Sequence, residues 1–255
     1  AGMNLAQCIL HGHTAYDLSE ADAKRFAPVF NNIEHLMRRV PEILGTHYDI
    51  AFPGKQLSTA RNLRALPLES EYKGAGAHMG QFYGWERPLY FDKTEEPRMT
   101  FDRPDWFENV RTEVMAAHER AAIFDCSSFG KIEVRGPEAE AFLLHTCSGF
   151  LSRAPGSVIY TAVLNKRGTF ESDITAQRIA HDHYRLFVGT AAIKRDLAWF
   201  QKHSEGFSIS MIDSTEDYAV LGLMGPEAAR IVCECGAPEL NQLAYFKVGA
   251  AHIAG

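Results

Sequence analysis

The stretch VIYTAVLNKRGTFESDITAQR, residues 158–178, decides the fold of this chain. Residues 158–164 are β-branched and aromatic, and residues 169–177 alternate between apolar and polar side chains, which is typical of paired strands. The polar residues 165–168, which include Gly168, separate the two runs. The stretch therefore predicts a β-hairpin with a glycine-containing turn.

Two acidic residues, Glu171 and Asp173, follow this turn, and Asp173 lies deep in the second strand. A carboxylate gains little on a half-buried sheet face, so an aspartate inside a strand faces either water or a cationic group. The residue type alone leaves both open for Asp173, because most carboxylates in proteins are surface groups.

The spacing Asn-x-x-Gly-x-Phe-x-x-Asp at residues 165–173 resembles the hairpin signature of the folate-binding aminomethyltransferase family, which includes the glycine cleavage T-protein. T-proteins usually carry two consecutive acids at its end, whereas this chain has Ser172-Asp173. This form resembles the branch that contains the dimethylglycine and sarcosine dehydrogenases.

Two other segments resemble the same dehydrogenases, namely HYDIAFPG at residues 47–54 and GWERP at residues 84–88. Because they occur in the same order, the resemblance covers nearly the whole chain. It implies that residues 1–95 are the C-terminal part of the central domain of an FAD-dependent oxidoreductase. It also implies that residues 96–255 are a truncated folate-binding aminomethyltransferase domain, so we expect a fragment of a longer polypeptide.

A repeated pattern indicates two similar strand–helix modules. Residues 131–135 alternate as a strand before a helix that opens at Gly136-Pro137, and residues 219–224 precede a helix that opens at Gly225-Pro226. Further predicted elements are strands at 184–188 and 207–212 and a helix at 191–203. Since hairpins dominate, we expect an α+β fold of mostly antiparallel sheets with helices packed on one face.

An apolar stripe near the N-terminus predicts an amphipathic helix whose stripe lies in the core. Its members, at steps of three and four, are Phe26, Phe30, Ile33, Met37, Val40 and Leu44. A helix-start signal occurs at Ser19, and Pro28 and Pro41 should break or kink the helix. We therefore expect a short helix and then a longer one from about Asn32 to Gly45.

Composition excludes several classes of function. The chain has 255 residues, a net charge of −6 and 46% hydrophobic residues, so no basic stripe is available for nucleic acid. No apolar run approaches the roughly 18 residues of a membrane span, and no signal peptide is visible. His11 and His13 have no third ligand, so no metal site is predicted. We expect a cytoplasmic protein, or a mitochondrial matrix protein if it is eukaryotic, with a small-molecule substrate.

The resemblance implies tetrahydrofolate as cofactor and an N-methylated glycine, or the iminium derived from it, as substrate. A fixed carboxylate in a partly desolvated pocket would stabilise such a cationic centre and could transfer a folate proton, so Asp173 is the predicted catalytic residue. Glu171, nearer the turn, is expected to be solvated. The predicted cofactor-binding residues are Thr175, which shares the face of Asp173, Tyr160, which offers a ring for stacking, and Gly189, which permits close approach. Packing, turn or surface roles would explain these three equally well.

Two functions remain open. The first is a tetrahydrofolate-dependent one-carbon (aminomethyl or methylene) transfer domain of a dimethylglycine or sarcosine dehydrogenase-like enzyme. The second is a non-catalytic folate-binding or scaffolding module, and the retained Asp173 favours the first. The family's FAD-binding domain would precede Ala1 and its folate-gripping acid would follow Gly255, so the chain alone is expected to be inactive. The sequence does not determine which N-methyl amine is used, whether the parent is a dehydrogenase or an oxidase, or its oligomeric state.

Overall fold

The hairpin predicted from residues 158–178 forms in the computed structural model, which describes residues 2–12, 14, 16, 18, 26–93 and 98–253. Strands β5 (Ser157–Leu164) and β6 (Phe170–Ala180) pair in antiparallel fashion. In the turn, the backbone N–H of Gly168 donates to the carbonyl of Asn165 at 2.8 Å, and Gly168 has a φ of +73°. This left-handed conformation explains why the turn contains glycine.

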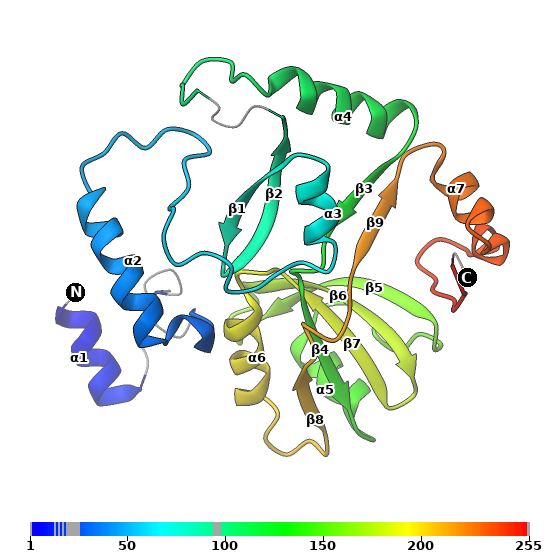
Figure 1. The fold of residues 1–255 in the computed structure, drawn as a ribbon. Coiled ribbons are helices and arrows are strands. Elements are labelled where there is room, and N and C mark those ends of the chain that lie inside the picture. Colours follow the sequence, from blue (N-terminus) through cyan, green and yellow to red (C-terminus); the bar gives the residue numbers. More distant parts are fainter. Residues whose placement is uncertain are drawn as a thin grey trace.

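The hairpin is one edge of a five-stranded sheet in the order β5-β6-β7-β4-β8. The other strands are β4 (Gly130–Arg135), β7 (His183–Val188) and β8 (Ser210–Asp213). Two smaller sheets pair β1 (Ala77–Phe82) with β2 (Trp85–Phe91) and β3 (Ala122–Asp125) with β9 (Leu221–Met224). Every pairing between these strands is antiparallel, which confirms the predicted sheet type (Figure 1).

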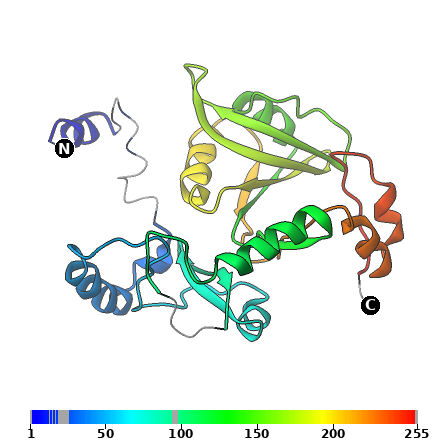
Figure 2. The same ribbon diagram turned by 90° about the horizontal axis from the view of Figure 1, so that it is seen from above.

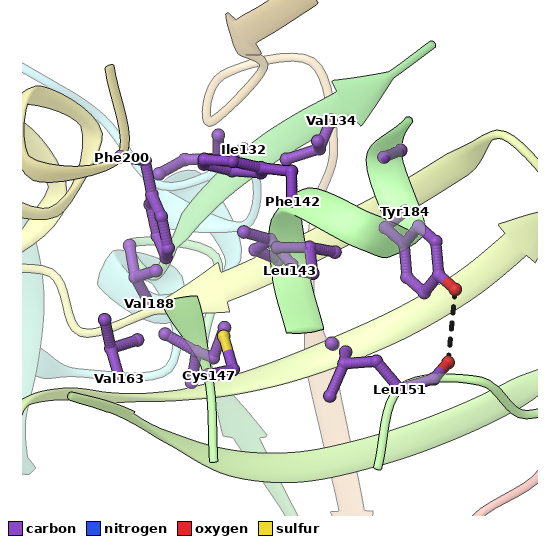
Figure 3. Close-up of a cluster of buried hydrophobic side chains, with 14 of the residues drawn as sticks. Ile132, Val134, Phe142, Leu143, Cys147, Leu151, Val163, Tyr184, Val188 and Phe200 are labelled. Carbon is purple, nitrogen blue, oxygen red and sulfur yellow. Dashed lines mark hydrogen bonds between the residues drawn. The ribbon is translucent and has the colours of Figure 1, made fainter. Parts of the chain in front are cut away.

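Helices α5 (Ala139–Thr146) and α6 (Ile193–Lys202) cover one face of the large sheet. Their buried apolar side chains pack against those of the sheet to form the hydrophobic core. Phe142 of α5 is fully buried, and its ring lies edge-on to Phe200 and Phe207 at centroid distances of 6.0 and 5.5 Å. On the sheet, Tyr184 is also buried, and its hydroxyl donates to the carbonyl of Leu151 at 3.1 Å (Figure 3). The core therefore fixes the sheet from the helical side.

Each of the two Gly-Pro junctions ends a strand and precedes a helix, as the sequence predicts. Gly136 follows β4 with a φ of +139°, and Gly225 follows β9 with a φ of +113°. A Cβ at either position would overlap a backbone oxygen, so both require glycine. Helix α5 follows the first junction and helix α7 (Ala228–Glu234) the second. The units differ in pairing, because β4 joins the five-stranded sheet whereas β9 pairs with β3.

The remaining helices lie outside the core of the large sheet. They are α1 (Gly2–His11), η2 (Pro28–Phe30), α2 (Ile33–Gly45), α3 (Glu69–Gly74), α4 (Phe107–Glu119) and η3 (Pro238–Gln242). In Figure 2 the blue-to-cyan segment, with the β1–β2 hairpin, lies to one side of the green-to-gold sheet. Among the residues placed in the structure, no helix has the length and apolar character needed to cross a bilayer.

The predicted role of the N-terminal stripe is wrong for this chain. Ile33, Met37 and Leu44 of α2 are each about 70% exposed, whereas His35 and Arg39 on the opposite face are buried. The polar face is inside because the Arg39 guanidinium donates to the carbonyl of Ala60 at 3.1 Å.

Two other predictions concern this region. The longer helix begins after Asn32, whose side chain caps it, but Pro41 lies within α2 and does not end it. The helix start at Ser19 lies outside the described residues.

A buried ion pair joins residues 57–66 to the β1–β2 hairpin. Arg61 Nε donates to Glu86 Oε1 at 2.8 Å, and Glu86 is almost fully buried. Burial opposes ionisation of Glu86, but the Arg61 guanidinium and the backbone N–H of Asn62 outweigh it and hold its pKa below the usual value. This ion pair thus fixes residues 57–66 against the β1–β2 hairpin.

Candidate functional site

Three of the four predicted site residues lie on the face of the hairpin opposite the core. Tyr160 pairs with Thr175 across β5 and β6, and Ala162 pairs with Asp173. Because side chains alternate along a strand and Ile174 is buried in the core, Asp173 and Thr175 face away from the helices. Tyr160 lies on the same side, next to Asp173 along the diagonal of the pairing.

Gly189, the fourth residue, reaches the same face from strand β7. Val188 pairs with Ile174, so Gly189 lies beside Asp173 at the end of β7. Its carbonyl accepts from the backbone N–H of Ala192 at 2.8 Å, and a Cβ at this position would meet no atom within 4 Å. The position is therefore open on the side where a ligand would approach, and the neighbouring turn fixes its backbone.

Asp173 makes one side-chain hydrogen bond on this face. The Tyr160 hydroxyl donates to Asp173 Oδ2 at 2.8 Å, and this bond raises the pKa of Tyr160. Both side chains are exposed, Tyr160 by 62%. Among the residues that the structure describes, no cation forms an ion pair with Asp173. The carboxylate is thus held in place without a counter-charge.

The predicted desolvated pocket around Asp173 is not formed by this chain alone. Asp173 is exposed, and three cavities in the described part of the chain are lined by other residues. The physical reason is that α5 and α6 pack on the opposite face of the sheet, which leaves the Asp173 side open. The four residues therefore share one face of the sheet that this chain leaves uncovered.

Glu171, expected to be solvated, is half-buried instead. The side chain of Asn165 donates to Glu171 Oε1 at 2.8 Å, and this bond holds the Glu171 carboxylate against the turn. The strand register shifts between Val163 and Leu164, opposite this position. Glu171 is therefore part of the turn structure.

A buried carboxyl on the core side of the same strand was missed from the sequence. Ser172, next to Asp173, donates to Asp196 Oδ2 of α6 at 2.6 Å, and Arg195 Nε donates to its Oδ1 at 3.1 Å. Asp196 is 3% exposed, and burial raises its pKa although both partners act against this. The pattern that could have revealed it is an aspartate within the apolar stripe of Ile193 and Phe200.

Asp196 should make stability depend on pH in a definite direction. The pKa of Asp196 is higher in the folded than in the unfolded state, so ionisation of the buried carboxyl destabilises the fold. This destabilisation is absent below the unfolded-state pKa and grows as pH rises through the folded-state pKa. We expect the stability of the wild type relative to Asp196→Asn to fall as pH rises from about 4. Urea unfolding of both proteins across this range measures it. If the stability of the wild type relative to Asp196→Asn rose with pH, the raised pKa of Asp196 would be contradicted.

No metal centre accompanies these residues. Groups of three or more histidine, cysteine, aspartate or glutamate residues able to hold an ion are absent among the residues described. Of the two histidines considered from the sequence, His13 lies outside that part.

Comparison with known proteins identifies the family. Residues 68–255 match the model of the GCVT N-terminal domain, and residues 11–65 match that of the FAD dependent oxidoreductase central domain. The chain belongs to the aminomethyltransferase (GCVT) family.

Individual proteins similar to this GCVT-family chain support the same family assignment. It is 30% identical to 4-methylaminobutanoate oxidase (formaldehyde-forming) of Paenarthrobacter nicotinovorans, over 91% of this chain and 28% of the relative. It is 30% identical to the mitochondrial pyruvate dehydrogenase phosphatase regulatory subunit of Mus musculus, over 92% of this chain and 28% of the relative. It is 28% identical to mitochondrial sarcosine dehydrogenase of Mus musculus, over 96% of this chain and 31% of the relative. The chain thus spans about 30% of the length of these relatives.

A solved structure agrees with the GCVT assignment. The glycine cleavage system aminomethyltransferase T of Bartonella henselae superposes with a TM-score of 0.59 and 27% identity, over 72% of this chain and 46% of that one. The α+β fold of antiparallel sheets and helices is therefore the aminomethyltransferase fold.

Proposed function

We propose that this chain belongs to an FAD-dependent N-methylglycine dehydrogenase or oxidase and contributes its tetrahydrofolate-dependent one-carbon transfer domain. The family of residues 68–255 and the sarcosine dehydrogenase relative support this proposal. Residues 1–95 would be the end of the oxidoreductase central domain and residues 96–255 the transfer domain. The ion pair of Arg61 with Glu86 favours a division after β2, whereas the two family models meet between residues 65 and 68.

The observation that carries the proposal is the Asp173 carboxylate, which the Tyr160 hydroxyl orients and no cation neutralises in the described part of the chain. An N-methylated glycine, and the iminium formed by its oxidation, present a cationic nitrogen or carbon–nitrogen centre. A carboxylate fixed before the substrate arrives stabilises such a charge without reorganising, and more strongly once the ligand excludes water.

The four site residues fit one side of a folate. Tyr160 exposes a ring on which a pterin or aminobenzoyl group can stack, Thr175 is half-buried beside it, and Gly189 leaves room for a ligand. When bound, tetrahydrofolate supplies the nitrogen atoms that accept the one-carbon unit. Asp173 would stabilise the positive charge of the donor and hold a proton at its Oδ atoms during transfer.

A second candidate is a non-catalytic folate-binding or scaffolding module in a longer protein. The similarity to the pyruvate dehydrogenase phosphatase regulatory subunit, whose name describes a regulator, favours it, as does the exposure of Asp173. The two candidates differ in one outcome, because only a transfer domain needs the charge of Asp173. The test is Asp173→Asn in the full-length protein with formation of methylene-tetrahydrofolate as the readout.

The Tyr160 hydroxyl should contribute a smaller effect than the carboxylate. Tyr160→Phe keeps the stacking ring and removes one solvent-exposed hydrogen bond to Asp173. We expect kcat for methylene transfer to fall by about 2- to 10-fold with unchanged stability. Tyr48→Phe, at a position that is 95% exposed, is the matched control and should have no effect. A Tyr160→Phe loss equal to that of Asp173→Asn would show that the hydroxyl has a larger role than orientation.

The place of action follows from this proposal. We propose that the parent protein works in the cytoplasm, or in the mitochondrial matrix if it is eukaryotic, as the mitochondrial relatives suggest. FAD would be held by a part of the parent protein other than the residues assigned here.

A further inference from the structure

Two strands, β3 and β8, are exchanged between the two strand–helix modules, of which the first contains β4 and α5 and the second β9 and α7. In the sequence β3 comes just before β4, and β8 comes just before β9. Each nevertheless pairs with the central strand of the other module, β8 with β4 and β3 with β9 (Figure 1). The two modules are therefore joined reciprocally.

The contacts at the two Gly-Pro junctions repeat this exchange. A Cβ on Gly136 would overlap the carbonyl of Ser208, two residues before β8. A Cβ on Gly225 would overlap the carbonyl of Arg120, two residues before β3. Equivalent parts of the two modules thus meet through equivalent contacts, so the repeat seen in the sequence is also a repeat of architecture.

The first module is complete on both sides of its central strand. Strand β4 pairs with β8 along one edge and with β7 along the other. Its apolar residues Ile132 and Val134 have no exposed surface. Helix α5, which follows, contributes four buried residues, namely Ala139, Phe142, Leu143 and Thr146.

The second module has one edge of its central strand open. Among the described residues, β9 pairs with β3 alone. The Val220 carbonyl accepts from the backbone N–H of Cys126 at 2.8 Å, so the backbone groups of Leu221 and Leu223 point to the edge away from β3. Counted back from the Gly-Pro junctions, these two leucines occupy the positions that Ile132 and Val134 have in the first module.

Apolar side chains are exposed around this open edge. Leu221 is 47% exposed, and Ile123, on the same face of the two-stranded sheet, is 63% exposed. Helix α7 has no buried residue, in contrast to α5. A two-stranded sheet is marginal by itself, and proteins normally pair or cover an apolar strand edge. The second module therefore lacks a partner.

We propose that the open edge of β9 binds an antiparallel β-strand with an apolar face, supplied by the part of the parent polypeptide that follows Gly255. This strand would take the place that β7 has beside β4 and would cover Leu221 and Ile123. It is favoured over a second copy of the chain because the first module receives its equivalent strand from the sequence after its own helix α5. The relatives are long enough to supply it, since this chain covers 28–31% of their length. The inference does not rest on the one-carbon transfer assigned to Asp173.

Thiol labelling of the full-length protein tests this, with Leu221→Cys compared with the matched variant Leu144→Cys. In this chain Leu221 and Leu144 are exposed to a similar extent, by 47% and 43%, and Leu144 lies on α5 of the complete module. We expect the Leu221→Cys thiol to react with iodoacetamide about 100-fold more slowly, because a paired strand must open before the reagent reaches it. Peptide mass spectrometry separates both thiols from the five native cysteines. A Leu221→Cys thiol that reacts as fast as the Leu144→Cys thiol would overturn the proposal.

A photo-cross-linker at Ile123 identifies what covers the edge. This position is 63% exposed, so Ile123→p-benzoylphenylalanine can be accommodated at the rim of the two-stranded sheet. In the full-length protein we expect cross-links to residues after Gly255 of the same polypeptide, with a yield that does not change on dilution. Cross-links to a second copy, with a yield that falls on dilution, would overturn the proposal, as would cross-links confined to residues before β3.

Discussion

Asp173→Asn in the full-length protein should lower kcat for methylene-tetrahydrofolate formation by about 100-fold or more. The substitution keeps the shape of the side chain and an oxygen that can accept from Tyr160, 2.8 Å away in the wild type. It removes the charge that would stabilise the cationic donor and the group that would hold the proton, which together contribute about 100-fold or more. Because Asp173 is exposed, the free energy of unfolding should change by less than about 0.5 kcal/mol.

The control for this experiment is Glu171→Gln on the same strand. Glu171 accepts from the Asn165 side chain, and glutamine can accept the same bond, so methylene transfer should be unchanged. Oxidation of the amine should be measured separately, since we expect it to be unaffected by Asp173→Asn. If the Asp173→Asn protein formed methylene-tetrahydrofolate at the wild-type rate, the catalytic role would be lost and the non-catalytic module would be favoured.

Phe142→Ala should destabilise the chain by about 3–5 kcal/mol. Phe142 is fully buried at the centre of the core, in contact with Phe200 and Phe207, so its removal leaves a cavity under the large sheet. This cost is a large share of the stability of an ordinary domain. Urea unfolding followed by circular dichroism measures it, and Phe142→Leu should show a smaller loss if the alanine variant does not fold.

Phe150→Ala is the matched control, because the same atoms are removed from a side chain that is 64% exposed. Its effect should stay within about 0.5 kcal/mol. Equal losses for Phe142→Ala and Phe150→Ala would mean that α5 does not pack on the sheet as described.

Local patterns predicted the elements that surround the candidate site. The alternation in residues 158–178 predicted the hairpin and placed Asp173 and Thr175 on one face, which the pairing confirms. The two Gly-Pro signals predicted where strands end and helices begin, because only glycine fits the left-handed backbone at Gly136 and Gly225. Such features depend on neighbours in sequence.

Features that depend on distant contacts were not predictable in this way. The stripe of α2 predicts burial, but the contact between Arg39 and Ala60 turns the polar face inward. The burial of Asp196 depends on Ser172, 24 residues earlier. The cavity that Trp85 lines also includes Leu63 and Lys194, which are far apart in the sequence, so no single stretch indicates it.

A structure of the full-length protein with the unreactive 5-formyl-tetrahydrofolate would show directly whether Asp173 faces the folate. We expect the ligand to lie on the sheet face formed by β5, β6 and the end of β7, with its rings against Tyr160 and a polar nitrogen at Asp173. A ligand bound elsewhere, with Asp173 still facing solvent, would contradict it.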